Sequence, residues 1–249
     1  MPFIRSALAG VLVIGVAAGA GLWHARQAPA VDAVQLEEWR AMVAQAMEPE
    51  ALRQLRQLAK GGSVAAQSAL GDALISAHDG ALHGEGMRWL EAASSADVRA
   101  QRVLGKVFLL GTDGVARDYP RALRLLRQAA EQNDGPAAYY LGLMYRSGYG
   151  VDIDMAQAAH WFDLAVRQEI PLAMFMLANA YRAGDGVPQD EARALALYQE
   201  AAERDLPQAV QTLAMAYQNG ELGLKRDEAA YRQQWLETAH SLKHPAPAP

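Results

Sequence analysis

The fold is decided by residues 136–168, PAAYYLGLMYRSGYGVDIDMAQAAHWFDLAVRQ. Ala137, Leu141 and Tyr145 are spaced i, i+4 and i+8 in the first half of this stretch, so they form an apolar stripe on one face of a helix. Residues 147–150 contain two glycines, which adopt positive φ readily, and these glycines predict the end of the helix. The first half of the stretch therefore predicts a helix followed by a sharp turn.

The second half of the same stretch predicts a second helix. Asp154 stands directly after the turn, where a carboxylate accepts a hydrogen bond from a backbone N–H that has no partner within the helix. The residues that follow repeat at helical spacing and are apolar: Ala158, Trp161, Phe162 and Ala165. We therefore interpret Asp154 as an N-cap, and the whole stretch as a pair of helices.

This pair is repeated along the chain at intervals of 36 or 37 residues. The repeating leucines are Leu104, Leu141, Leu177 and Leu213, and an alanine stands four residues before each. Nine or ten residues after each leucine comes a glycine: Gly114, Gly150, Gly186 and Gly223. Four residues after each glycine comes an aspartate: Asp118, Asp154, Asp190 and Asp227. This period is typical of helical solenoids, and a recurring aspartate is better explained by capping than by catalysis or metal binding.

Less regular copies extend the repeat in both directions. Ala66, Leu70 and Gly71 begin an upstream unit without the Gly-Val turn, and Trp235 with Leu236 is expected to close the last unit. We therefore divide the chain into four segments: 1–30, a signal peptide or signal anchor; 31–47, a connecting helix; 48–242, a solenoid of four to five repeats; and 243–249, a disordered Pro-Ala tail.

The recurring pattern resembles the Sel-1-like repeat, a relative of the tetratricopeptide repeat. The best matches are the segments 142–151 and 158–162, and the resemblance covers roughly residues 48 to 242. It implies an all-α fold, a right-handed α/α superhelix of helix pairs with a concave groove. It also implies an adaptor or scaffold, since known members mostly have that role and many act in bacterial envelopes.

The amino terminus differs in composition from the repeats. An uncharged apolar run extends from Ser6 to Trp23, with Arg5 before it and Arg26 after it. A run of this length fits either a retained membrane anchor or a cleaved export signal. Both interpretations predict a cell-envelope protein, either anchored in the inner membrane with a periplasmic repeat domain or exported to the periplasm.

Composition excludes several classes of function. The net charge is −5 with both signs interspersed, so no nucleic-acid partner is expected. The chain has no cysteine, which excludes disulfides and thiolate metal sites. None of the common hydrolase, metalloprotease or phosphate-loop motifs occurs, and His78 and His83 lie in a Gly-rich loop without metal-ligand spacing. We therefore expect no catalytic residue, no metal and no cofactor.

A binding surface is predicted on the first helix of each unit. Residues two, six and nine positions after the repeating alanine share a face that is separate from the core stripe, and they vary from unit to unit. The predicted concave face consists of Arg102, Lys106, Tyr139, Leu143, Arg146, Phe175, Asn179, Arg182, Gln211, Met215 and Gln218. This mixture of aromatic, apolar and cationic groups suits a peptide or helix of another protein. Tyr139 and Phe175 are the members most suited to packing between helices instead.

The leading hypothesis is a non-enzymatic scaffold that binds another protein or peptide through its concave face and is attached to the membrane if the amino-terminal segment is uncleaved. Two alternatives remain open from the sequence. One is a hydrolase acting on cell-wall material, and the other is a periplasmic regulator that restrains a sensor protein.

Overall fold

The computed structural model describes residues 31–77 and 79–241, with side chains up to residue 236. The predicted signal or anchor segment, His78 and the predicted tail lie outside these described residues. The described residues from 33 onward belong to one unit, Ala33–Pro249. Within the described range, no helix is both long and apolar enough to cross a membrane.

The described part of the chain is helical, which confirms the predicted all-α class. The α-helices are α1 (Ala33–Ala46), α2 (Pro49–Lys60), α3 (Val64–Ser76), α4 (His83–Ala93), α5 (Val98–Leu110), α6 (Tyr119–Ala130), α7 (Gly135–Ser147), α8 (Met155–Val166), α9 (Pro171–Ala183), α10 (Glu191–Glu203), α11 (Pro207–Asn219) and α12 (Glu228–Ser241). A single 3₁₀ turn, η1 (Gly80–Leu82), precedes α4. In the same residues, extended pairing is limited to an isolated bridge between Thr112 and Val115.

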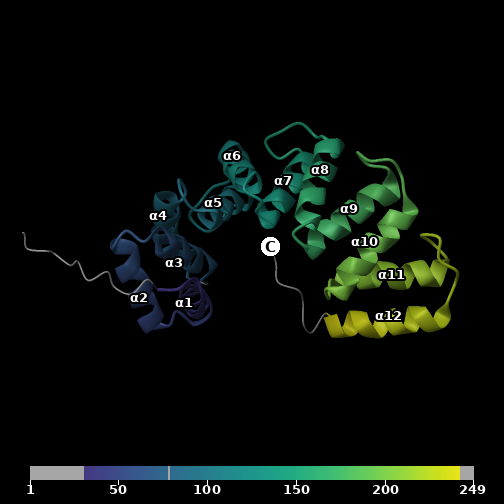
Figure 1. Ribbon diagram of the computed structural model, residues 1–249, viewed down its shortest axis with the longest axis horizontal. Coiled ribbons are helices and arrows are strands. Elements are labelled where there is room, and N and C mark those ends of the chain that lie inside the picture. The colour runs from purple at the N-terminus through teal and green to yellow at the C-terminus, as the bar shows by residue number, and fades with distance from the viewer. Residues whose placement is uncertain (1–30, 78, 242–249) are drawn as a thin grey trace, which may run out of the picture. The chain divides into compact units, whose positions relative to one another are not determined.

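Consecutive helices form pairs that stack in chain order (Figure 1). The pairs are α3–α4, α5–α6, α7–α8, α9–α10 and α11–α12, and the second helix of one pair packs on the first helix of the next. Helix α1 does more than connect segments, because it packs on both α2 and α3. Buried apolar side chains of consecutive pairs therefore pack into shared clusters, as the period of the sequence predicts.

The repeating leucines lie in this core. Leu104, Leu141, Leu177 and Leu213 are at most 3% exposed, and the alanine four residues before each is fully buried. The paired helices approach closely where glycine replaces a larger residue. A Cβ at Gly105 would lie 2.6 Å from Cγ of Leu126, and a Cβ at Gly142 would overlap the ring of Phe162. The apolar stripe therefore marks the helix interface, as predicted.

The recurring aspartates are N-caps, as predicted. The Oδ1 atoms of Asp118, Asp154 and Asp190 each accept a hydrogen bond from the backbone N–H three residues later, at 3.0, 2.9 and 3.0 Å. Asp227 caps α12 in the same way, accepting from the N–H of Ala229 at 2.9 Å and of Ala230 at 3.0 Å. These carboxylates hold the second helices of the repeats in place by satisfying backbone groups.

The expected closure of the last unit by Trp235 and Leu236 is wrong. Trp235 is 46% exposed and Leu236 is 73% exposed. Counted from the N-cap, Trp235 rather than Leu236 occupies the position that Phe162 fills in its own unit, eight residues after the aspartate. Leu236 is therefore turned outward, and no further helix of the described chain packs on the outer side of α12.

Candidate protein-binding surface

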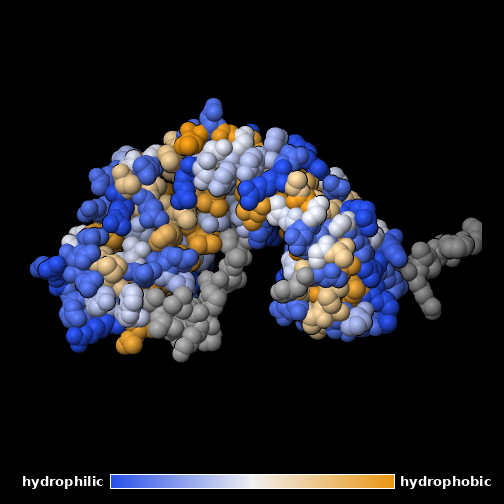
Figure 2. Space-filling view, turned by 180° about the vertical axis from the view of Figure 1, so that it is seen from behind, coloured by the Kyte–Doolittle hydropathy of each residue, from blue (hydrophilic) through white to orange (hydrophobic). Residues whose placement is uncertain are grey.

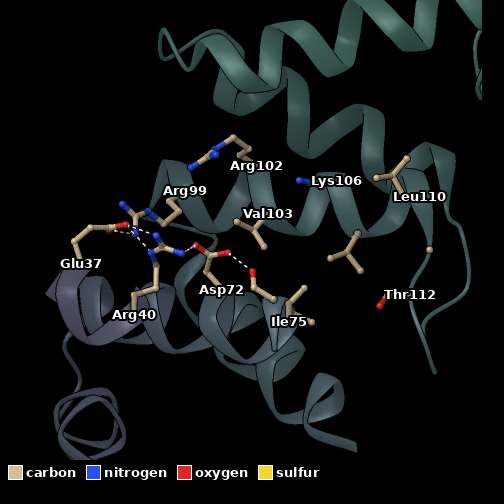
Figure 3. A pocket seen from close by; sticks show the side chains of 13 residues that line it. Glu37, Arg40, Asp72, Ile75, Arg99, Arg102, Val103, Lys106, Leu110 and Thr112 are labelled. Carbon is tan, nitrogen blue, oxygen red and sulfur yellow. Dashed lines mark hydrogen bonds and ion pairs between the residues drawn. The ribbon is translucent and has the colours of Figure 1, made fainter. Parts of the chain in front are cut away.

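A pocket of about 550 Å³ opens between α1, α3 and α5 (Figure 3). Helix α5 supplies six of the thirteen lining residues, and Gly111 and Thr112 extend the lining into the following loop. The residues that line it are Glu37 and Arg40 from α1; Asp72, Ile75 and Ser76 from α3; and Arg99, Arg102, Val103, Lys106, Val107 and Leu110 from α5. Two of them, Arg102 and Lys106, belong to the predicted binding face.

One end of the pocket holds a chain of ion pairs between helices. Arg40 contacts both Glu37, at 2.6 Å, and Asp72, at 3.4 Å, and Arg99 contacts Glu37 at 2.6 Å. Burial raises the pKa of Glu37, but hydrogen bonds from Arg99 and Arg40 outweigh it and hold the pKa below its ordinary value. Because Glu37 stays ionised, it fixes two guanidinium groups beside the pocket.

Arg102 links the pocket to the next repeat. Its Nε atom lies 3.2 Å from Oδ2 of Asp134, whose Oδ1 accepts a hydrogen bond from the N–H of Ala137 and so caps α7. The contact is an ion pair without hydrogen-bond alignment, and the Nε–H is buried without an acceptor. Burial raises the pKa of Asp134 above its ordinary value, although Arg102 and the cap act in the opposite direction.

Apolar side chains gather toward the other end of the pocket, beside Lys106 and Thr112 (Figure 3). The labelled side chains of Ile75, Val103 and Leu110 lie away from the ion-paired cluster, toward Thr112 (Figure 3). Leu110 is 51% exposed at this end, although Val103 is buried. The ammonium of Lys106 lies 5.6 Å from the centre of the Tyr140 ring. The pocket thus offers cations and an apolar wall side by side.

The predicted positions on α7, α9 and α11 lie outside this pocket. Tyr139 is 7% exposed and contacts the rings of Tyr140 and Phe162, so it packs between helices rather than facing solvent. The remaining members are half-buried (Leu143, Phe175 and Asn179) or exposed (Arg146, Arg182, Gln211, Met215 and Gln218). Several face positions are therefore accessible, but they form a surface rather than an enclosed site.

Three of these side chains contact neighbouring residues. Arg146 reaches Sδ of Met176 at 3.1 Å, and Arg182 pairs with Glu221 at 3.2 Å. Asn179 accepts a hydrogen bond from the buried hydroxyl of Tyr198 at 2.7 Å. Arg146 thus connects α7 to α9 at the exposed surface, and Arg182 connects α9 to the turn after α11. A partner that binds there would contact more than one repeat.

Four charged residues of the pocket were missed by the sequence reasoning: Glu37, Arg40, Asp72 and Arg99. Arg99 had a detectable signal, because Arg99, Arg102 and Lys106 follow i, i+3, i+7 spacing on one helix face. Helix α1 had none, because its sequence does not carry the repeat pattern. Among the described residues, no group of three metal-ligating side chains forms a metal site.

The face of the described chain that Figure 2 shows is mostly hydrophilic, with apolar patches scattered over it. The most exposed large apolar side chains are far apart in sequence: Val34, Leu110, Ile153 and Leu236. Single exposed apolar residues are common in soluble proteins. The feature that distinguishes this surface is therefore the pocket between α1, α3 and α5, where several cationic side chains line a recess.

A family model described as the Sel1 repeat matches residues 98–134, 135–169, 171–206 and 212–231, just over half of the chain. The chain belongs to the Sel1 repeat family. The predicted resemblance is thereby confirmed, and Sel1 repeat proteins generally act in protein–protein interactions. Proteins of this family are typically non-enzymatic scaffolds. A comparison with curated proteins found no significant match.

Solved structures of other Sel1 repeat proteins resemble this one. A Sel1 repeat protein from Oxalobacter formigenes is 26% identical with a TM-score of 0.73, and the match covers 83% of this chain and 86% of that one. The protein c5321, a protective antigen present in uropathogenic Escherichia coli strains, is 32% identical with a TM-score of 0.67. The match covers 76% of this Sel1 repeat protein and 41% of c5321.

A more distant structure shares the fold alone. The immunity protein Pa5087 from Pseudomonas aeruginosa is 15% identical with a TM-score of 0.55, over 86% of this chain and 84% of that one. The arrangement of helix pairs in this Sel1 repeat protein thus recurs where little sequence identity remains.

Proposed function

We propose that this protein is a non-enzymatic scaffold that binds another protein along the face formed by the first helices of its repeats. The observation that carries the proposal is the pocket between α1, α3 and α5, where four cationic side chains lie next to an apolar wall. The exposed positions on α7, α9 and α11 extend the same helix face through three further repeats. Such mixed surfaces favour protein partners, because apolar anchors supply affinity and charged groups set orientation.

We also propose that this scaffold acts in the cell envelope. The support is the uncharged run from Ser6 to Trp23, flanked by Arg5 and Arg26. A reporter enzyme that is active only outside the cytoplasm, fused after residue 249, should be active. Activity that persists when residues 6–23 are deleted would argue against an export role for this run.

Site-specific photo-crosslinking in intact cells tests the binding face. The full chain should carry the crosslinking amino acid at Arg146, which is exposed on α7, or at Gln157, which is exposed on α8. We expect a discrete crosslinked product from the Arg146 position and none from the Gln157 position. The same product from both positions, or from neither, would contradict the proposed face.

A charge-reversal variant gives an independent measurement. Arg146→Glu combined with Arg182→Glu should remove the crosslinked product, because both cations are exposed on the proposed face. The matched control is Arg88→Glu combined with Arg124→Glu, on the second helices α4 and α6, where both arginines are also exposed. Retention of the product in the first variant, or its loss in the control, would overturn the assignment.

A further inference from the structure

We infer that the pocket between α1, α3 and α5 binds an acidic segment of the partner protein, with a carboxylate at its charged end and an adjacent apolar residue against Leu110. This inference rests on the proposed binding function and adds the chemistry of the ligand. It depends on three features of the pocket: the excess of cations, the way these cations are held, and the position of the apolar wall.

The first feature is a local charge opposite to that of the whole chain. The pocket is lined by four cations, Arg40, Arg99, Arg102 and Lys106, and by two carboxylates, those of Glu37 and Asp72. Asp134 pairs with Arg102 just outside the lining, and the positive side chains still outnumber the negative ones. The whole chain carries a net charge of −5. This local excess attracts an anionic group, and electrostatic complementarity of this kind selects partners.

The second feature is that the guanidinium groups are already positioned. Glu37 accepts one hydrogen bond from Arg40 within α1 and another from Arg99, and the contact with Arg99 joins α1 to α5. A guanidinium carries several N–H donors, so a group held by one carboxylate can still donate to a second. Because the side chains are ordered before the ligand arrives, binding loses less conformational entropy.

The third feature is the neighbouring apolar wall. Leu110 is half exposed at the end of α5, and Ile75 and Val103 lie between it and the charged end (Figure 3). A carboxylate in the charged end would therefore place the next residues of an extended chain over apolar surface. Burying an apolar side chain there adds affinity that a free small anion lacks. This favours a peptide segment with acidic and apolar residues next to each other.

The chain's own remaining segments do not fit this description. Residues 1–30 contain Arg5 and Arg26 but no aspartate or glutamate, and residues 242–249 contain Lys243 and no acidic side chain. Neither segment supplies acidic side chains to the pocket. Charge complementarity therefore assigns the pocket to a segment of a different protein.

Peptide binding to the full chain in mild detergent tests the inference. The probes are three fluorescent ten-residue peptides. One contains a Leu-Glu-Glu-Leu core, and in the other two both glutamates of this core are replaced by glutamine or by lysine. We expect fluorescence anisotropy to show at least about tenfold tighter binding of the glutamate peptide, a difference of about 1.4 kcal/mol. Its affinity should fall as salt is added, because salt screens half-exposed charges.

Two variants and one control locate the site. Lys106→Gln and Arg99→Gln should each weaken binding of the glutamate peptide about threefold or more, since each removes one charge from the pocket. Arg124→Gln removes an exposed cation from α6 and should leave binding unchanged. Arg99 also holds α1 through Glu37, so thermal unfolding of each variant should be measured. The half-buried Lys106 provides the decisive variant if Arg99→Gln fails to fold.

The possible outcomes separate this inference from the proposed function. Equal binding of the three peptides, no binding of any, or the same loss in Arg124→Gln would overturn the acidic ligand, even if crosslinking at Arg146 still captures a partner. Self-association of the chain that the glutamate peptide disrupts would assign the pocket to a second copy and would also overturn it. Tight binding of the glutamate peptide, with no crosslinked product from position 146, would support the acidic ligand of the pocket and contradict the proposed partner face.

Discussion

Replacing Leu141 with alanine tests the central packing of the solenoid. Leu141 lies on α7 and is fully buried against the neighbouring helices. The substitution therefore removes apolar surface and leaves a cavity that the surrounding helices fill only in part. Such changes destabilise proteins by roughly 2–5 kcal/mol. We expect a decrease in the free energy of unfolding within this range, measured by urea denaturation followed by circular dichroism.

Leu236→Ala is the matched control, because it makes the same chemical change at the surface. Leu236 is 73% exposed, so only about a quarter of the roughly 2 kcal/mol for full burial of a leucine is at stake, about 0.5 kcal/mol. The dependence of the unfolding free energy on urea should be compared as well, because stacked repeats can unfold in stages. Equal destabilisation by the two substitutions would refute the assignment of the core.

Three further predictions follow from the caps, the turns and the ion pairs. Asp190→Ala should lower the free energy of unfolding by about 1 kcal/mol, whereas Asp190→Asn should change it by only a few tenths, and chemical denaturation would measure both. Gly186 has a φ of 73° and a Cβ there would overlap the backbone of residue 155, so Gly186→Ala should cost more than about 2 kcal/mol in the same assay. Gly223 has a φ of 72° and open space around it, so Gly223→Ala should cost only about 1 kcal/mol, and similar losses at both glycines would be inconsistent with the turn contacts. The hydrogen bond from Arg56 is the main reason why the pKa of Glu85 is lowered, so this pair stabilises the protein above the ordinary carboxyl pKa and the stabilisation is lost as the pH falls through the lowered value. Melting temperatures of the native chain and of Glu85→Gln should therefore differ at neutral pH and converge in acid, and a constant difference would count against the pair.

Much of the fold was predictable because the repeat supplies several independent signals for the same elements. The leucine period located the core, and the aspartates located the starts of the second helices, as their hydrogen bonds confirm. The last unit was misjudged because Trp235 and Leu236 were matched as a pair rather than counted from Asp227. A shift of one residue rotates a helical side chain by about 100°, enough to move it from core to surface.

The candidate site was predictable only in part. Arg102 and Lys106 were found because they belong to a repeating helix whose faces can be assigned from the sequence. Arg40 comes from α1, which carries no repeat pattern, and the packing of α1 on α3 depends on contacts between residues far apart in the chain. Local spacing does not reveal such contacts, so one wall of the pocket became visible only in the structure.

The turn glycines differ in ways that matter for engineering the chain. Around Gly114 and Gly223 the structure leaves open space, whereas Gly186 lies against the backbone of the preceding unit. Epitope tags or fluorophore attachment sequences inserted at Gly114 or Gly223 should therefore project outward without displacing a neighbouring unit. The same insertions at Gly186 would push two adjacent repeats apart.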